Sequence, residues 1–211
     1  MRGSAVAVAA LVLFLGSESV AAQIYVTGVV TSVDPGLSGG LSSLGITVGT
    51  PYSATIVLDT TRPDSQSDPT VGAYQNAVTS LVLSAGSFVG VFAAPPDCCS
   101  SYVQVGLNPP PSLSVWQAST VEDEGIPIAG SVILLMNVEL QGAGFTSDSM
   151  VPPSSTSWSP LSNLDLIGDH GNHVFRGNVA TVVVPEPVAL AGIAPGLVAA
   201  LFLVRTRGRR R

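Results

Sequence analysis

The side chains best suited to chemistry in this sequence lie in two short polar segments. Asp169-His170-Gly171-Asn172-His173 places two imidazoles beside a carboxylate, and a metal ion could use this set if the segment closed into a loop. The two histidines would face opposite sides of a strand, so the alternative is an exposed hairpin turn. The second segment, Glu122-Asp123-Glu124, offers the oxygen ligands that calcium prefers, and its alternative is a solvated loop. We expect no cofactor; the alternative is a bound calcium ion.

Covalent and acid–base catalysis find little support in the sequence. The chain has no lysine, which excludes Schiff-base chemistry and a P-loop lysine. A serine nucleophile would need a histidine as its base, and the sequence offers only His170 and His173. No nucleophile-elbow motif is present. Glycoside hydrolysis needs two facing carboxylates, and no motif selects such a pair among the acids. Asp59, Asp64 and Asp68 flank a polar loop and could supply oxygen ligands to calcium, with a solvated loop as the alternative. We therefore expect a protein that is not an enzyme.

The two cysteines, Cys98 and Cys99, are adjacent in a proline-containing segment. A vicinal disulfide can form in an oxidising compartment, but adjacent residues rarely reach disulfide geometry without strain. The alternatives are a pair of unlinked loop cysteines or a cross-link to a partner chain. Metal or redox chemistry is a further interpretation. Two cysteines are too few for a zinc site.

Six aromatic residues leave two interpretations open. They could stack on sugar rings if they formed an exposed platform, or they could belong to the core, where aromatic residues of a small β-domain are usually found. These residues are Tyr25, Tyr52, Tyr74, Tyr102, Trp116 and Trp158.

The composition indicates what kind of domain must position these groups. Of 211 residues only 10% are charged, and 22 Gly and 16 Pro are scattered between runs rich in Val, Thr and Ser, which is typical of an all-β protein with many turns. Residues 23–184 hold two arginines against twelve Asp and Glu, a formal charge of −10. A domain this acidic repels phosphate backbones, so we expect no binding to nucleic acid.

Short segments with alternating or β-branched character predict about eight strands. Residues 52, 54, 56 and 58 are apolar between polar neighbours, which is the period of a strand with one buried face. Residues 132–136 are apolar on both faces and indicate a central strand, with a helix as the alternative. Turn residues such as Asp34-Pro35-Gly36, Gly39-Gly40 and Gly142-Ala143-Gly144 separate the segments. We predict one antiparallel β-sandwich or jelly roll over residues 23–184, with strands at 24–33, 52–60, 78–84, 87–93, 102–105, 113–118, 132–140 and 174–184.

The first 22 residues are typical of a cleavable secretory signal. Arg2 precedes an uninterrupted apolar run at residues 5–15, and small residues follow at 16–22. The apolar run is well short of the roughly 20 residues of a spanning helix. We predict cleavage by signal peptidase between Ala22 and Gln23, with cleavage after Ala21 as the alternative.

The C-terminal segment, residues 185–211, combines a break, an apolar run and a basic end. Pro185-Glu186-Pro187 ends the preceding strand, and residues 188–204 carry no charge. Seventeen residues of helix span roughly 26 Å, slightly less than a bilayer core of about 30 Å, so residues 188–204 predict a marginal transmembrane helix. Five arginines follow, and the positive-inside rule keeps them in the cytoplasm: Arg205, Arg207, Arg209, Arg210 and Arg211.

This order of features resembles the PEP-CTERM sorting signal of Gram-negative bacteria. The resemblance implies that an exosortase, a membrane-embedded cysteine transpeptidase, recognises Pro185, Glu186 and Pro187 and cleaves the tail. It also implies a link to extracellular polysaccharide and biofilm. The arginines are interrupted by Thr206 and Gly208, and the alternative is an ordinary tail anchor.

Two internal segments resemble the β-rich ectodomains of the same family. One is the run from Gly49 to Asp59, followed by Pro63-Asp64-Ser65 and Gly72-Ala73-Tyr74. The other is Phe175-Arg176-Gly177-Asn178-Val179, which resembles the last strand of those domains. The resemblance implies a fold and no catalytic residue.

The sequence therefore predicts an exported protein that passes through an inner-membrane-anchored precursor to the cell surface or extracellular matrix. Its expected partners are signal peptidase, an exosortase-type enzyme, the membrane and extracellular polysaccharide. The leading hypothesis is a non-catalytic surface protein. A carbohydrate-binding module is the alternative, and a secreted hydrolase is a third.

Overall fold

A computed structural model describes residues 21–93, 101–107, 114–143, 145, 147–153, 157–169 and 171–185, without the side chains of residues 93, 122–124 and 157. Nearly all of the regular structure in these residues is antiparallel β-strand. The one helix among the described residues is the short α2 (Ser38–Ser43), and the strands are β1 (Ala21–Val33), β2 (Pro51–Asp59), β3 (Val71–Gln75), β4 (Val78–Ala85), β5 (Phe88–Ala93), β6 (Ser101–Gly106), β7 (Ser114–Ile128), β8 (Ser131–Ala143), β9 (Ser157–Trp158), β10 (Asn163–Gly168) and β11 (His173–Val183).

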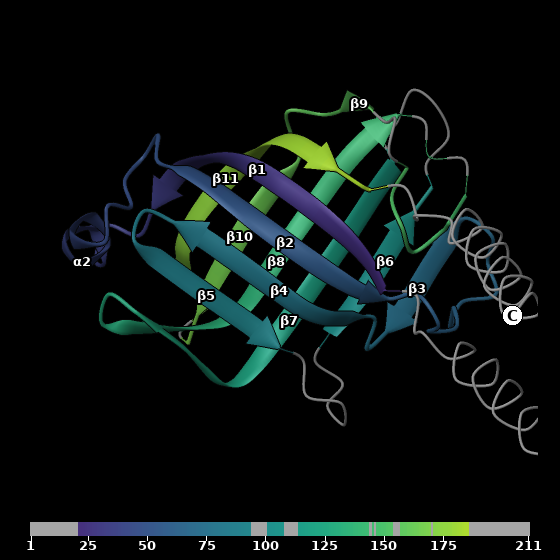
Figure 1. Ribbon diagram of the computed structural model, residues 1–211, viewed down its shortest axis with the longest axis horizontal. Helices are drawn as coiled ribbons and strands as arrows, with labels where there is room; N and C mark the ends of the chain where they lie inside the picture. The colour runs from purple at the N-terminus through teal and green to yellow at the C-terminus, as the bar shows by residue number, and fades with distance from the viewer. Residues whose placement is uncertain are drawn as a thin grey trace, which may run out of the picture.

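All of these strands belong to one curled sheet. Its order is β3-β6-β7-β8-β10-β11-β1-β2-β4-β5, with β9 paired to β8. The sheet curls until β4 and β5 come into contact with β6 and β7 across its concave side, as Figure 1 shows. This curl encloses the core, because each strand turns every second side chain inward. The fold is therefore mainly antiparallel β, as the composition and turn residues predict.

The alternation seen in the sequence determines the core. In β2 the buried residues are Tyr52, Ala54, Ile56 and Leu58, and the residues between them are exposed or half-buried. Residues 132–136 lie in β8 as a strand, which confirms the predicted strand over the helix. The centre of the core is filled by large, fully buried side chains: Trp116, Phe92, Phe175, Ile24, Ile56, Leu81, Leu83, Ile133 and Met136.

The first and last strands of the domain are neighbours in the middle of the sheet. β1 pairs with β11 on one side and with β2 on the other, so that Tyr25 lies opposite both Val183 and Thr55. Because the β1–β11 pair is antiparallel, the start of β1 and the end of β11 lie at the same end of the sheet. Both chain ends of the domain therefore leave it together, opposite α2 (Figure 1).

Tyr52 closes the packing between these central strands. Its ring covers the Cα atoms of Gly28 in β1 and Gly177 in β11, where a Cβ would lie 2.7 Å and 2.4 Å from the ring atom Cε1. Its hydroxyl donates a hydrogen bond to the carbonyl of Asn178 at 2.8 Å. Burial raises the pKa of Tyr52 above its usual value, so the hydroxyl stays protonated. The two internal segments singled out in the sequence thus meet at one contact.

We expect Tyr52→Phe to lower the free energy of unfolding by about 1–2 kcal/mol, because it leaves the Asn178 carbonyl without this donor at a poorly hydrated position. Chemical denaturation monitored by fluorescence would measure the loss. Tyr25→Phe is the control, because the Tyr25 hydroxyl donates to Gln23 at the surface, and it should change stability by less than about 0.5 kcal/mol. Equal effects of the two changes would contradict the role given to the Tyr52 hydroxyl.

Several local predictions need correction. Gly39 and Gly40, predicted as a turn, lie inside α2, where Leu41 is fully buried and the hydroxyls of Ser42 and Ser43 donate to the carbonyls of Gly39 and Gly40. Gly142 and Ala143, also predicted as a turn, are the last residues of β8. The strand predicted at 113–118 continues to Ile128, and β3, β9 and β10 were not predicted.

Candidate functional site: a polar cleft at the far end of the central strands

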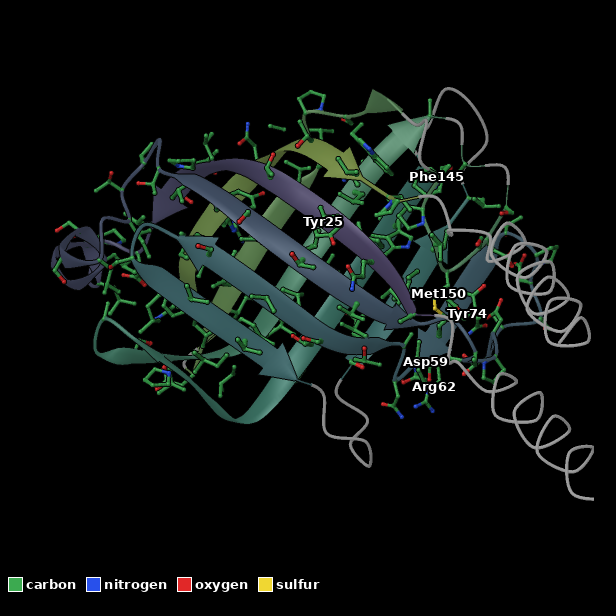
Figure 2. All side chains as sticks on the ribbon, viewed as in Figure 1. Tyr25, Asp59, Arg62, Tyr74, Phe145 and Met150 are labelled. Carbon is green, nitrogen blue, oxygen red and sulfur yellow. The ribbon has the colours of Figure 1, made fainter. Side chains whose placement is uncertain are left out.

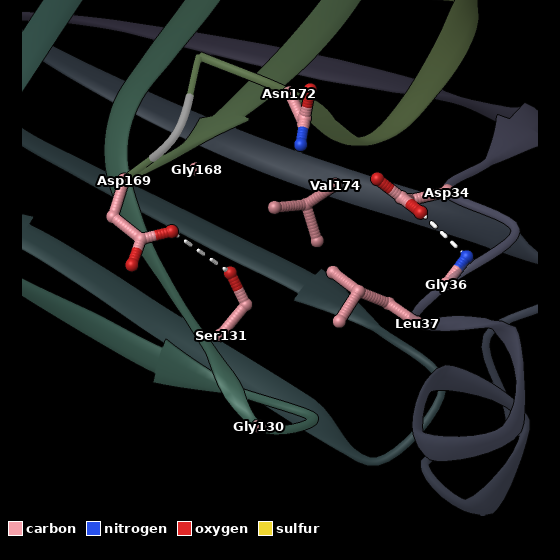
Figure 3. A pocket seen from close by; sticks show the side chains of 9 residues that line it. All are labelled: Asp34, Gly36, Leu37, Gly130, Ser131, Gly168, Asp169, Asn172 and Val174. Atoms are coloured by element: carbon pink, nitrogen blue, oxygen red, sulfur yellow. Dashed lines mark hydrogen bonds between the residues drawn. The ribbon is translucent and has the colours of Figure 1, made fainter.

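A group of polar loop residues lies where β1 ends and β11 begins. Three connections meet there: the segment after β1, the β7–β8 turn and the β10–β11 turn (Figure 3). They enclose a cavity of about 270 Å³. An adjoining hollow of about 290 Å³ shares Asp34 and Asn172 with it. We call the two together the distal cleft, lined by Ser32, Val33, Asp34, Pro35, Gly36, Leu37, Gly130, Ser131, Gly168, Asp169, Gly171, Asn172, His173, Val174 and Arg176.

The segment after β1 holds one wall of the cleft. The backbone N–H of Asp34 donates to the carbonyl of Val174 at 3.0 Å, which ties this wall to β11. The Asp34 carboxylate accepts a hydrogen bond from the Gly36 N–H at 2.6 Å, and the Leu37 N–H donates to the Asp34 carbonyl at 3.1 Å. These bonds form the turn that the sequence predicts at Asp34-Pro35-Gly36. Leu37 and Val174 give the cavity an apolar floor (Figure 3).

The opposite wall is built from two tight hairpin turns. The β7–β8 turn has positive φ at Ala129 (51°) and Gly130 (87°), a geometry that costs an alanine roughly 1–2 kcal/mol. In the β10–β11 turn, Gly168 N–H donates to the carbonyl of Asn172 at 2.8 Å. Ser131 joins the two turns, because its hydroxyl lies 3.5 Å from the Asp169 carboxylate.

Asp165, His173 and Arg176 form an ion-pair cluster at the rim of the cleft. Register places Asp165 of β10 directly opposite Arg176 of β11. The Asp165 carboxylate contacts His173 Nδ1 at 2.7 Å and Arg176 Nε at 3.2 Å. Arg176 Nη2 also contacts the His173 ring at Nε2. The side chains of His173 and Arg176 are 41% and 49% exposed, so solvent screening limits the contribution of this cluster to stability to roughly 1 kcal/mol.

The His173 ring lies between the Asp165 carboxylate and the Arg176 guanidinium. If Nδ1–H donates to Asp165, then Nε2 keeps the lone pair that accepts from Arg176. A carboxylate that orients an imidazole is half of a nucleophile-activating triad. Among the described residues, however, the ring bonds to Asp165 and Arg176 and to no hydroxyl or thiol.

The structure brings together only part of the predicted metal site. Asp169 lines the cleft and His173 lies at its rim, within the exposed hairpin that was the alternative interpretation. His170 lies outside the described residues. The other lining side chains, Asp34, Ser131 and Arg176, were not predicted. They are far apart in sequence, and only the pairing of β1 with β11 and of β8 with β10 gathers them.

The second predicted metal segment lies in a strand. The backbone of residues 122–124 belongs to β7, at an irregularity where the register with β8 jumps from Val121 to Ile126. This corrects the expectation of a loop. The side chains of Glu122, Asp123 and Glu124 lie outside the described residues, as do Cys98 and Cys99.

The loop acids Asp59, Asp64 and Asp68 each stabilise a local turn. Asp59 and Asp68 accept bonds from the hydroxyl and the backbone N–H of Thr61 and Thr70, respectively, two positions later. Asp64 accepts from the backbone N–H groups of Gln66 and Ala73, each at 2.9 Å. In the described part of the chain, no three His, Cys, Asp or Glu side chains are arranged to hold a metal ion.

These bonds predict a measurable titration. The Thr61 hydroxyl, then the Thr61 N–H and Arg62, lower the pKa of Asp59 below its usual value. The ionised carboxylate therefore stabilises the fold above the unfolded pKa of about 3.9, and this contribution is lost as the pH falls through the folded pKa. Thr61→Val should raise the pKa of Asp59 and leave that of Asp68 unchanged, and Thr70→Val should do the reverse. An NMR carboxyl titration measures the pKa values of Asp59 and Asp68. If one substitution shifted both pKa values, the two carboxylates would not belong to independent turns.

The aromatic residues are divided between the core and the surface. Trp116 and Tyr52 are buried, at 0% and 3% exposure, which confirms the core interpretation for these two. Tyr25 is 40% exposed on the outer face of β1. Trp158 packs edge-on against Phe145, with ring centroids 5.7 Å apart. The described residues that line the distal cleft include no Phe, Tyr or Trp; polar side chains and an apolar floor line it instead.

The predicted processing segments border the described domain. Ala21 and Ala22 begin β1 and pair with Asp59 and Leu58 of β2, so cleavage after Ala22 would remove two residue pairs from the sheet. Pro185 follows β11 and is exposed. Glu186, Pro187, the apolar run 188–204 and Arg205 to Arg211 lie outside the described residues. In the part of the chain that the structure describes, no helix has both the length and the apolar character needed to cross a membrane.

No protein-family model matches this chain, and no curated protein or solved structure matches it either.

Proposed function

We propose that residues 23–184 are the exported domain of a non-catalytic protein of the cell surface or extracellular matrix. An exosortase-type transpeptidase sorts it by the tail at 185–211, with residues 188–204 as a transient transmembrane helix, and it acts alongside extracellular polysaccharide. The contacts of β4 and β5 with β6 and β7 across the core support a sandwich-like architecture for this domain.

One observation carries the proposal. The tail follows the end of β11, whereas the distal cleft lies at the start of β11 and the end of β1. β1 has 13 residues, so these two ends are separated by about 40 Å. A domain held by such a tail would present the distal cleft away from the membrane.

The test is to express the full chain in a host that has an exosortase and in one that lacks it. We expect loss of the residues beyond Pro185-Glu186-Pro187 only in the first host, measured by intact mass of the mature protein. Replacing both Pro185 and Pro187 by alanine should block this processing. Pro63→Ala, in an exposed loop, is the control and should be processed normally. An intact arginine-rich end in both hosts would overturn the proposal.

A second candidate function, carbohydrate binding, is favoured by the lining of the distal cleft. Asp34, Ser131, Asp169, Asn172 and Arg176 supply carboxylate, hydroxyl, amide and guanidinium groups, which can exchange hydrogen bonds with sugar hydroxyls. Titration calorimetry with neutral and acidic polysaccharides would test it. Asn172→Ala should weaken binding, and Gln104→Ala, exposed on β6, should not. Equal binding by both variants would remove the cleft from consideration.

A further inference from the structure

Strand β5 ends the sheet and leaves one backbone edge free of pairing among the described strands. Its neighbour is β4, and no described strand lies beyond it in the sheet. Val89 and Val91 point to the outer face, 63% and 56% exposed, whereas Phe88 and Phe92 point into the core. An aliphatic edge strand of this kind is a template for pairing with another strand.

The register of the β4–β5 hairpin determines which backbone groups face that edge. Gly86 and Ser87 form a two-residue turn, so its flanking residues Ala85 and Phe88 exchange hydrogen bonds. In antiparallel pairing the bonded positions alternate, and Gly90 and Phe92 therefore also bond to β4. The N–H and C=O groups of Val89 and Val91 are directed outward, where a further strand could bind them.

The features that protect edge strands are missing from β5. Proteins block such edges with lysine, proline, inward-pointing charges or bulges. Phe88-Val89-Gly90-Val91-Phe92 contains no charge and no proline, and its pairing with β4 is regular. The sequence carries no charged residue between Asp68 and Asp97. A strand that docks along β5 therefore meets no charged residue of β5 or of its neighbour β4.

The symmetric sequence of β5 makes it suited to pairing with a second copy of itself. Phe-Val-Gly-Val-Phe reads the same in both directions about Gly90. When a strand pairs antiparallel with its own copy, a two-fold axis relates the two strands, so residue pairs on the two sides of the axis are repeated. We propose that β5 binds β5 of a second copy of this chain, with the two-fold axis at Gly90, and joins two sheets into one.

This register pairs the backbone groups at the free edge of β5 and brings its exposed valines into contact. Gly90 lies opposite Gly90 of the second copy, and Val89 lies opposite Val91 of the second copy, with which it exchanges two backbone hydrogen bonds. The same exchange is repeated on the other side of the axis. The four valines form one cross-strand cluster on the outer face. On the inner face, a Cβ at position 90 would lie 2.8 Å from Phe88 Cζ and 3.1 Å from Phe92 Cε2, so Gly90 leaves room for these two core rings.

A charge placed on this edge tests the contact. We expect Val89→Lys to weaken association of the full chain about tenfold or more, because each dimer would place two ammonium groups in the valine cluster. Leu161→Lys is the matched control, since Leu161 is also 63% exposed but lies between β9 and β10, and it should leave association unchanged. Sedimentation of the detergent-extracted full chain measures the difference in association. Any association through the tail is the same in all variants and does not affect the comparison. Equal association of the two variants would overturn the proposal.

Cross-linking tests the register. In a Cys98→Ser, Cys99→Ser background, the full chain with both Val89→Cys and Val91→Cys should be joined into a dimer by a short bis-alkylating thiol reagent, because the Cβ atoms of a hydrogen-bonded pair are too far apart for an unstrained disulfide. Each single cysteine variant should not, because residue 89 faces residue 91 of the second copy and not its own equivalent. Efficient cross-linking of either single variant, or none of the double variant, would overturn the two-fold axis at Gly90.

Discussion

Gly28→Ala should destabilise the domain by about 3 kcal/mol or more, because the added methyl group has no room. A Cβ at position 28 would lie 1.8 Å from the backbone carbonyl oxygen of Asn178 and 2.7 Å from the Tyr52 ring. The register between β1 and β11 shifts just beside Gly28, which brings this carbonyl close. The clash is with backbone in the two central strands, so it cannot be relieved by rotating a side chain. Chemical denaturation of the exported protein measures the loss.

Two further glycines make this prediction specific. Gly106→Ala, in β6, meets no atom within 4 Å and should change stability by less than about 1 kcal/mol. Gly177→Ala clashes mainly with the Tyr52 ring, at 2.4 Å, so Tyr52→Ala should partly rescue it: the double variant should lose less stability than the sum of the two single losses. The same addition should not rescue Gly28→Ala, where the obstacle is a carbonyl. Rescue of both, or of neither, would contradict the packing described for Tyr52.

Trp116→Ala should lower the free energy of unfolding by about 3–5 kcal/mol, the usual cost of removing a buried tryptophan side chain. Trp116 is fully buried in β7, and its indole N–H donates to the carbonyl of Met150 at 2.7 Å. The hydroxyl of Tyr74 donates to the nearby carbonyl of Asp148 at 2.9 Å, and Tyr74 and Met150 lie near the end of the sheet where β3 is located (Figure 2). These two bonds hold the segment 147–153 over β3 and β7.

The loss should therefore be accompanied by local exposure. In Trp116→Ala, amide hydrogen exchange should become faster in residues 147–153 than in β1 and β11, because one of the two bonds that hold this segment is gone. Trp158→Ala is the control, since Trp158 is half-buried and contacts Phe145, and it should cost about 1–2 kcal/mol. A uniform increase in exchange across the sheet would indicate loss of the core without a special role for the bond to Met150.

The strands that could be predicted are those whose pattern is strong by itself. β1, β2, β4, β8 and β11 alternate or are rich in β-branched residues, and all were anticipated to within a few residues. β3, with the sequence Val-Gly-Ala-Tyr-Gln, has weak strand propensity. It becomes a strand because β6 pairs with it and because Tyr74 bonds to the segment above. Contacts between residues far apart in the sequence cannot be predicted from a short segment of sequence.

The same reason explains how much of the cleft was found. Asp169 and His173 were candidates because they are close in sequence. Asp165 lay eight residues from His173 and was overlooked, although the alternation of β10, with Leu164 and Leu166 buried, could have placed it on the outer face. Asp34 joins them only because β1 and β11, the two ends of the domain, are neighbours in the sheet. That pairing closes a loop of more than a hundred residues, which local patterns do not predict.

The central β1–β11 pair also determines how the domain would respond to mechanical load. If the tail is held and a ligand pulls at the far end of the strands, the force runs along β11. Antiparallel hydrogen bonds lie perpendicular to the strands, so a force in this direction shears all the bonds of β11 to β1 and β10 at once. Pulling from the side would instead open them one after another, like a zipper. The strand that continues into the tail is thus loaded in its most resistant direction and is flanked by a partner on each side.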